Sequence, residues 1–226
     1  MAVPGKIKLG PEKGGTESEK TAWIVETYGY TMKDAMATLQ QQLAEKLYYG
    51  HLQIIVVNKN IIEEGVTEIN DFLKREYEVR RTAWMVASEG EASKVIKAAP
   101  PVEIIPSLYM SNTLDNSVRF GRLPREQFGK FWVDISDFGV DGHLPLVKVM
   151  DTDRILINGI VYFKGNKMVG TMTPIQTGMY LAITEKNPGG YTVAITTNDG
   201  AKYLIESLER KAIINVKVEN GKPSAN

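Results

Sequence analysis

The side chains that could perform acid–base or metal chemistry gather between residues 134 and 143. Asp134, Asp137, Asp141 and His143 form the densest acidic cluster of the chain. Closely spaced oxygen ligands can hold a hard cation, although this spacing differs from that of a calcium-binding loop. Two of the carboxylates could instead act as a general acid and a general base. The simpler interpretation is a solvated helix end and loop, whereas a functional cluster predicts a pocket with converging carboxylates and a raised pKa.

The other histidine, His51, follows the predicted C-terminus of a helix. There the helix dipole would stabilise a protonated imidazole by about 0.3–1 kcal/mol. The alternative is a structural histidine that forms hydrogen bonds where the helix meets the next strand. With two histidines and no recognisable serine nucleophile motif, a catalytic triad has little support. We therefore assign no catalytic, cofactor-binding or metal-binding residue.

Two residue pairs could contribute to an interface. Arg80 and Arg81 open the predicted third strand, where they could bind an anion or an acidic partner or simply remain solvated. Tyr48 and Tyr49 could form an exposed aromatic patch of the kind found in protein interfaces. The alternative is that one tyrosine packs in the core while the other lies on the surface. Together with His51, these four residues are expected to serve interaction or structure.

The composition excludes several classes of protein. The chain has 226 residues, with 27 Lys and Arg against 27 Asp and Glu, so its formal net charge is zero. A balanced chain without a Lys/Arg cluster lacks the electrostatic footprint of a nucleic-acid-binding protein. The lack of cysteine excludes disulfides, thiolate catalysis and cysteine-ligated zinc. No segment approaches the roughly 20 apolar residues that span a bilayer, and residues 1–19 do not resemble a signal peptide, so we expect the chain as given to be soluble.

The first half predicts a βαβαβ order, which places successive strands parallel. Strands are expected over residues 21–28, 52–57 and 82–87. The first helix should run from the capping residue Thr31 to Tyr49, with Gly50 as a left-handed C-terminal cap. The second helix should place four apolar residues on one face and carries a glycine in its interior, which weakens it: Ile62, Gly65, Val66, Ile69 and Leu73.

The second half is richer in strands. Strands are expected over 144–150, 154–163 and 167–171, with a hairpin turn at Gly165-Asn166, followed by a helical segment over 174–181. Three more strands are expected over 191–197, 201–207 and 212–218. The fold class is therefore mixed α/β, a helix-flanked sheet followed by a β-rich second part. We expect an α/β domain over 1–150 and a smaller β-rich domain over 151–226.

The C-terminus predicts an unpaired edge. Asn220-Gly221 is typical of a hairpin turn, yet the residues after it do not predict a strand. We interpret this as a chain cut at Asn226 from a longer protein.

Several motifs, in order over residues 21–182, resemble the Ger(x)C family, the C subunits of spore germinant receptors. Each motif is weak alone, and their order and spacing carry the resemblance. The matching segments are Leu47-Tyr48-Tyr49-Gly50-His51, Glu64-Gly65-Val66, Asp71-Phe72-Leu73-Lys74-Arg75, Ile104-Ile105-Pro106-Ser107-Leu108-Tyr109, Leu144-Pro145-Leu146 and Asn158-Gly159-Ile160-Val161-Tyr162-Phe163-Lys164.

The resemblance implies a non-enzymatic lipoprotein on the outer face of the inner spore membrane. It would act beside multispan A and B subunits in nutrient-triggered germination, through protein–protein contacts and without a cofactor. The family's signal peptide and lipidated cysteine are not in this sequence, so membrane attachment is expected only of a full-length protein. The resemblance also implies a third domain, which would follow residue 226. The alternative from the residues is a small-molecule-binding protein or a hydrolase that uses the cluster from Asp134 to His143.

Overall fold

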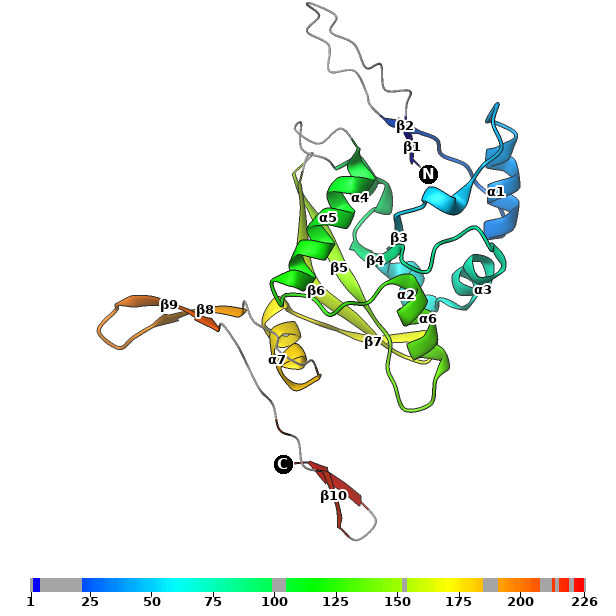
Figure 1. Cartoon of the computed structure of the whole chain (residues 1–226). Coiled ribbons are helices and arrows are strands. Elements are labelled where there is room, and N and C mark those ends of the chain that lie inside the picture. Colours follow the sequence, from blue (N-terminus) through cyan, green and yellow to red (C-terminus); the bar gives the residue numbers. More distant parts are fainter. Residues whose placement is uncertain are drawn as a thin grey trace, which may run out of the picture.

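A five-stranded sheet between two layers of helices forms the body of the protein (Figure 1). The computed structural model describes residues 2–4, 22–98, 105–151, 154–184, 191–207, 213, 216–219 and 222–225. The strands of this sheet follow one another in space as they do along the chain: β3 (Ile54–Asn58), β4 (Trp84–Glu89), β5 (His143–Asp151), β6 (Arg154–Lys164) and β7 (Lys167–Met172).

The sheet is parallel in its first part and antiparallel in its second. Strands β3, β4 and β5 pair in parallel, and β5, β6 and β7 pair antiparallel. Parallel strands need long crossovers, which here are helical, whereas antiparallel strands can be joined by short turns. Gly165 adopts the positive φ of 58° that the tight turn between β6 and β7 requires. A parallel βαβαβ unit is thus present, but it consists of β3, β4 and β5, because the predicted first strand over residues 21–28 is not part of this sheet. The mixed α/β fold class is confirmed.

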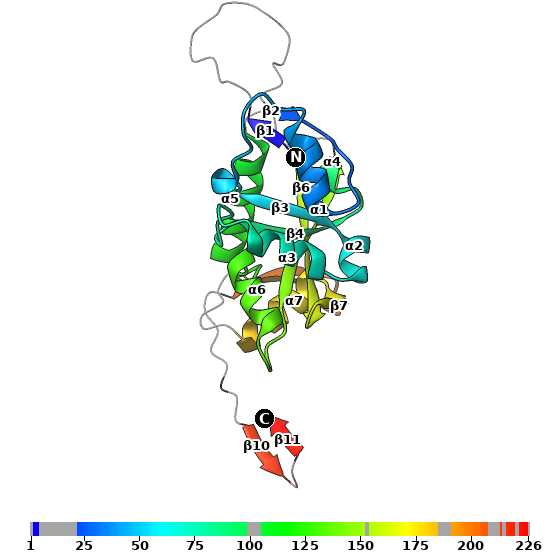
Figure 2. The same cartoon turned by 90° about the vertical axis from the view of Figure 1, so that its right-hand side faces the viewer.

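Two apolar cores lie on opposite faces of the sheet. Figures 1 and 2 show α2 (Lys59–Glu64), α3 (Thr67–Arg75) and α6 (Phe128–Ser136) on one face. The other face is covered by α4 (Ala92–Lys97), α5 (Pro106–Arg119) and α7 (Pro174–Thr184). In β4, Trp84 and Val86 enter one core while Met85 and Ala87 enter the other. This alternation explains why the strand is buried on both faces.

The first predicted helix ends earlier than expected. Helix α1 spans Met32–Gln40 and Thr31 caps it as predicted, but the extension to Tyr49 is wrong. The side chain of Gln40 accepts from the backbone N–H of Leu47 at 2.7 Å and donates to the carbonyl of Glu45 at 3.0 Å. These bonds hold the chain after Gln40 in a loop. The segment Tyr49–His51 forms a separate 3₁₀ turn, η1, and Gly50 is not among the glycines with positive φ.

The second predicted helix is two helices. Gly65 separates α2 from α3 with a φ of 125°, a conformation that other residues rarely adopt. The next backbone N–H, that of Val66, donates to the carbonyl of Asn166 at 3.1 Å and so ties this break to the turn between β6 and β7. The predicted apolar face is confirmed, since all four of its residues are buried in one core: Ile62, Val66, Ile69 and Leu73.

Three two-stranded sheets accompany the body, and two of them correct a prediction. Strand β2 (Ala22–Ile24) pairs with β1 (Ala2–Pro4) and does not join the main sheet. Strands β8 (Tyr191–Thr196) and β9 (Lys202–Ser207) form a hairpin near their predicted positions.

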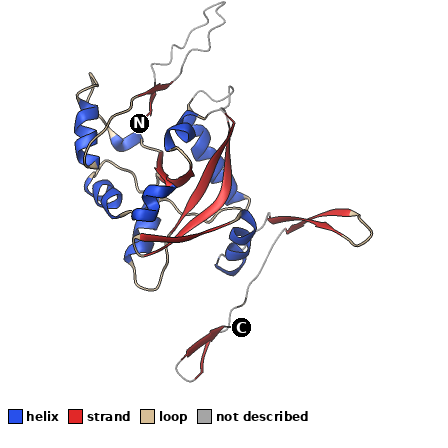
Figure 3. Cartoon of the chain, turned by 180° about the vertical axis from the view of Figure 1, so that it is seen from behind, coloured by secondary structure: helices blue, strands red, loops and turns tan. Residues whose placement is uncertain are grey.

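After β10 (Val216–Glu219) the chain returns as β11 (Lys222–Ala225), so the expected unpaired edge is wrong (Figure 3). The turn residues Asn220 and Gly221 lie outside the described residues. Pro223 is accommodated opposite Val218, because the missing N–H of a proline can face outward in a two-stranded sheet.

The predicted domain boundary at residue 150 falls where β5 turns into β6. The main sheet includes both strands, and β6 places Val161 and Phe163 in the core beneath α2, α3 and α6. The division into domains at this position stays a prediction. No helix among the described residues is long and apolar enough to cross a bilayer.

Truncation tests the boundary. A chain that ends at residue 150 lacks Val161 and Phe163, which are fully buried. Each lost core side chain costs about 2–5 kcal/mol when its volume is not refilled. We therefore expect the chain 1–150 to lack a cooperative thermal transition and the chain 1–184 to retain one. Circular dichroism melting measures both, and cooperative unfolding of 1–150 alone would instead place a domain boundary there.

Candidate functional site

The predicted acidic cluster does not come together. Asp134 and His143 are buried, whereas Asp137 and Asp141 lie exposed in the loop between α6 and β5. Asp137 caps the end of α6, where its backbone N–H donates to the carbonyl of Val133 at 2.9 Å. The helix therefore ends at Ser136. Asp134 lies within the helix and is buried, whereas Asp137 and Asp141 lie beyond its end.

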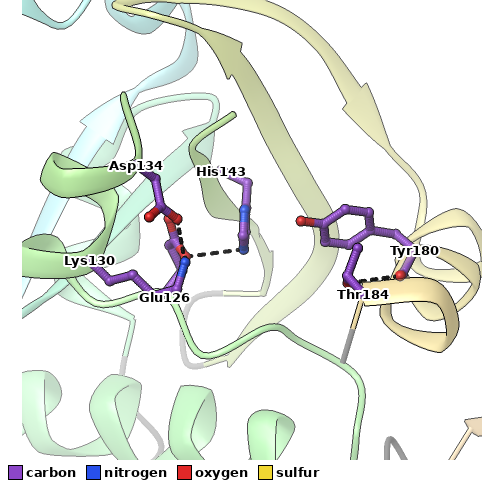
Figure 4. A network of polar contacts seen from close by, with 6 residues as sticks. All are labelled: Glu126, Lys130, Asp134, His143, Tyr180 and Thr184. Atoms are coloured by element: carbon purple, nitrogen blue, oxygen red, sulfur yellow. Dashed lines mark hydrogen bonds and ion pairs between the residues drawn. The ribbon is translucent and has the colours of Figure 1, made fainter. Parts of the chain in front are cut away.

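Asp134 and His143 instead belong to a buried polar cluster with Glu126, which Lys130 joins from the surface with a side chain that is 54% exposed (Figure 4). Glu126 lies two residues before α6, so Glu126, Lys130 and Asp134 follow at steps of four on one side of the helix. Nζ of Lys130 donates to Oε2 of Glu126 at 2.9 Å and to Oδ2 of Asp134. Nε2 of His143, at the start of β5, lies 3.4 Å from Oε2 of Glu126.

Burial decides the charge of this polar cluster. The side chain of Glu126 is completely buried, and desolvation raises its pKa to about 8 despite the nearby ammonium of Lys130. Desolvation and the Lys130 charge lower the pKa of His143 to about 4, which the Asp134 charge and the Asp141 backbone only partly offset. At pH 7 Glu126 is therefore mostly protonated and His143 is neutral. Nζ of Lys130 also contacts the Asp134 side chain.

The cluster links three elements of the fold. Glu126 and α6 meet the start of β5 at His143, and the ring of Tyr180 from α7 packs edge-on against His143 with centroids 5.6 Å apart. Figure 4 shows the Tyr180 hydroxyl pointing toward His143. Oγ1 of Thr184 donates to the carbonyl of Tyr180 at 2.9 Å on the far side of that ring. The arrangement can hold a proton inside the protein, but its two titrating groups are shielded from any dissolved substrate.

The surface hollows lie elsewhere. One of about 530 Å³ is lined by Thr197, Asn198, Asp199 and Tyr203 near the β8–β9 hairpin. Another of about 260 Å³ lies between α2 and β7. Within the described ranges, no group of three or more His, Cys, Asp or Glu residues could hold a metal ion. The pocket with converging carboxylates that a hydrolase would need is thus not formed by Asp134, Asp137, Asp141 and His143.

The predicted tyrosine pair divides between core and surface. Tyr49 packs against the core and its backbone N–H donates to Oε2 of Glu78 at 3.1 Å. Burial and the neighbouring carboxylates of Glu76 and Glu78 raise the pKa of Tyr49. Tyr48 is exposed, covers Gly50, and meets the exposed ring of His51 edge-on at 5.5 Å. Whether Tyr48 and His51 contact a partner stays a prediction.

The predicted arginine pair precedes β4 on the surface. Arg80 and Arg81 are both exposed. The guanidinium of Arg81 lies 4.9 Å from the ring centroid of Trp132, and Nζ of Lys74 lies 4.6 Å from the same ring. Two cations over one indole are a favourable cation–π arrangement. An interaction of Arg80 or Arg81 with an anion stays a prediction.

Sequence reasoning missed Glu126, Lys130 and Tyr180. The spacing of Glu126, Lys130 and Asp134 at four residues was visible and is typical of ion pairs on a helix. Such pairs usually lie on exposed faces, so the spacing alone did not indicate a buried carboxyl. The contact of Tyr180 with His143 joins residues far apart in the chain and had no local signal.

The shifted pKa values predict how stability depends on pH. Between pH 4.5 and 8 the folded protein holds a proton on Glu126 that the unfolded chain has released, so the free energy of unfolding falls as pH rises. Between pH 4 and 6.5 the unfolded chain protonates His143 and the folded protein does not, so the opposite slope applies. The two effects offset each other at acidic pH. From pH 6.5 to 8 only the Glu126 effect remains, amounting to about 2 kcal/mol.

Urea unfolding at pH 6.5 and 8 measures this difference. We expect Glu126→Gln to remove the loss of stability, because an amide does not titrate. Glu64→Gln, at an exposed glutamate of α2, is the matched control and should keep the wild-type slope. An unchanged slope in Glu126→Gln would show that another group causes the pH dependence.

Almost the whole chain matches two models of known protein families. Residues 1–149 match the family described as "Spore germination protein N-terminal domain", and residues 158–226 match "Spore germination B3/GerAC like, C-terminal". Spore germination protein GerQC of Bacillus cereus is 24% identical over 225 residues, which cover 99% of this chain and 62% of that protein. Spore germination protein KC of Bacillus subtilis (strain 168) is 28% identical over 123 residues, or 53% of this chain and 30% of that protein.

A third relative extends the same result. Spore germination protein B3 of Bacillus subtilis (strain 168) is 22% identical over 88% of this chain and 54% of its own length. The chain thus spans less than two thirds of the length of these relatives. No solved structure matches it significantly. Since the first family model covers more than half of the chain and the second follows it in order, the chain belongs to the GerAC family of spore germination proteins.

Proposed function

We propose that this chain is part of the C subunit of a spore germinant receptor, which supports nutrient-triggered germination through contacts with other proteins. The observation that carries the proposal is the ordered match of both germination-family models, over residues 1–149 and 158–226. The names of the relatives, spore germination proteins GerQC, KC and B3, support the same role.

The proposed partners are the multispan A and B subunits of the receptor. The full-length protein would be held as a lipoprotein at the outer face of the inner spore membrane. The 226 residues contain no cysteine, so they do not include the residue that would carry the lipid. The role of this part would be to present a folded surface to the membrane subunits.

A non-enzymatic role agrees with the state of the titratable groups. The strongly shifted pKa values belong to Glu126 and His143, which face each other inside the protein. Catalytic groups must touch their substrate, and the buried polar cluster instead bridges α6, β5 and α7. We therefore propose that the cluster stabilises the fold and that the hydrolase alternative fails for want of an accessible site.

Deletion of the full-length gene from its spore-former tests this proposal. We expect the spores to lose the response to at least one nutrient, because a receptor without its C subunit should not signal. The fall in optical density during germination measures the response across a panel of amino acids, sugars and nucleosides. A trigger that does not require nutrient receptors should still germinate the mutant spores.

Complementation separates the subunit from an enzyme. Wild-type protein and Glu126→Gln should restore germination equally when their spore levels are equal, because the proposal assigns Glu126 no chemistry. Normal germination of the deletion strain on every nutrient, with paralogous receptors also removed, would contradict the proposed function. Failure of a stable, fully abundant Glu126→Gln protein that still co-purifies with the multispan subunit would contradict the non-enzymatic role.

A further inference from the structure

The loop between α6 and β5 presents a concentrated apolar tip. The side chain of Phe138 is fully exposed, with a relative exposure of 102%, and Val140 and Val133 are 45% and 53% exposed. Figures 1 and 2 show this loop projecting from the body beyond the end of α6. Single exposed apolar residues are ordinary, but here Phe138 and Val140 lie in the loop and Val133 lies in the last turn of α6, so exposed apolar side chains concentrate within eight positions of the chain.

The base of this loop is held firmly. Gly142 packs so closely on α6 that a Cβ atom there would collide with Cγ2 of Ile135. The carbonyl of Gly142 accepts from the backbone N–H of Phe163 at 2.9 Å. The flanking residues Asp134 and His143 belong to the buried polar cluster, so both ends of the loop are attached to it.

A fixed base lowers the cost of binding at the tip. Ordering a mobile segment costs free energy on association, and a pre-organised segment avoids much of that cost. The tip lies in open space, because Gly139 has a φ of 89° and nothing lies within 4 Å of the position of a Cβ atom. An aromatic side chain on such a support is typical of the anchor residues that dominate protein interfaces.

The charges of the loop indicate the kind of partner. Asp137 and Asp141 flank the apolar tip, and residues 136–142 contain no Lys or Arg. Both aspartates are exposed. Two carboxylates beside Phe138 disfavour insertion into a membrane with anionic lipids, since like charges repel. They favour an apolar recess whose rim carries Lys or Arg, because complementary charges speed association and select the partner.

We propose that Phe138, with Val133 and Val140, docks into an apolar recess with a basic rim on a partner protein. Asp137 and Asp141 pair with the rim, and the buried polar cluster positions the loop. This inference rests on the proposed function, because the recess is expected on a multispan subunit of the receptor.

Photocrosslinking in spores tests the docking site. The full-length protein carries the photoreactive amino acid p-benzoylphenylalanine in place of Phe138. The matched control carries it in place of Phe120, which follows α5 and is 57% exposed. Purification through a tag on the multispan subunit measures association separately from crosslinking. We expect a crosslink from position 138 but not from 120, to a segment of the multispan subunit that contains apolar residues and Lys or Arg.

Charge reversal in the loop tests whether the recess on the partner protein has a basic rim. Combining Asp137→Lys with Asp141→Lys should lower the crosslink yield at least fivefold, because the new charges repel a basic rim. The exposed pair Glu63→Lys and Glu64→Lys in α2 is the control for total charge and should leave the yield unchanged. Raising the ionic strength from about 0.1 M to 1 M should also lower the yield, since the Debye length falls from about 10 Å to about 3 Å.

The possible outcomes distinguish a failure of the docking site from a failure of the proposed function. Co-purification without a crosslink from position 138 would overturn the docking site and leave the proposed function standing. Loss of co-purification for every variant and for wild type would contradict the proposed function itself. A crosslink only to lipid, only within the same chain, or one insensitive to charge reversal would also overturn the docking site.

Discussion

Strand β4 is buried on both faces, and the position of every other layer depends on it. Its side chains alternate between two cores, so helices must cover both sides of the sheet. One layer consists of α2, α3 and α6, and the other of α4, α5 and α7. The parallel neighbours β3 and β5 then require long crossovers, which supply all of these helices except α7.

The parts of the fold that could be predicted are those with a local signal. The run Thr82 to Ala87 indicated a buried strand, and the hairpin at Gly165-Asn166 was found from its turn residues. The apolar spacing of Ile62, Val66, Ile69 and Leu73 gave the right buried face. It could not reveal the break at Gly65, because that conformation is fixed by a hydrogen bond from Val66 to the distant Asn166.

The candidate site could be predicted from local sequence signals even less completely than the fold. Composition and spacing drew attention to Asp134 and His143, and the structure keeps both in one polar cluster. Their neighbours Asp137 and Asp141 are excluded because α6 ends at Ser136, so both aspartates lie in the exposed loop beyond the helix. Glu126 looks like a surface residue in the sequence, and only the packing of α6, β5 and α7 makes it buried. Its altered pKa is a property of that packing, which no single segment of the chain encodes.

The hairpin from β5 to β6 also bears on how the family could have evolved. The two family models meet between residues 149 and 158, yet strands on both sides of that interval belong to one sheet. An exchange of either half between relatives would pair a new β6 with an old β5. The register and the core beneath both strands would then have to match at once. Recombination at this point should therefore be rare, and the two halves should have diverged together as one inherited unit.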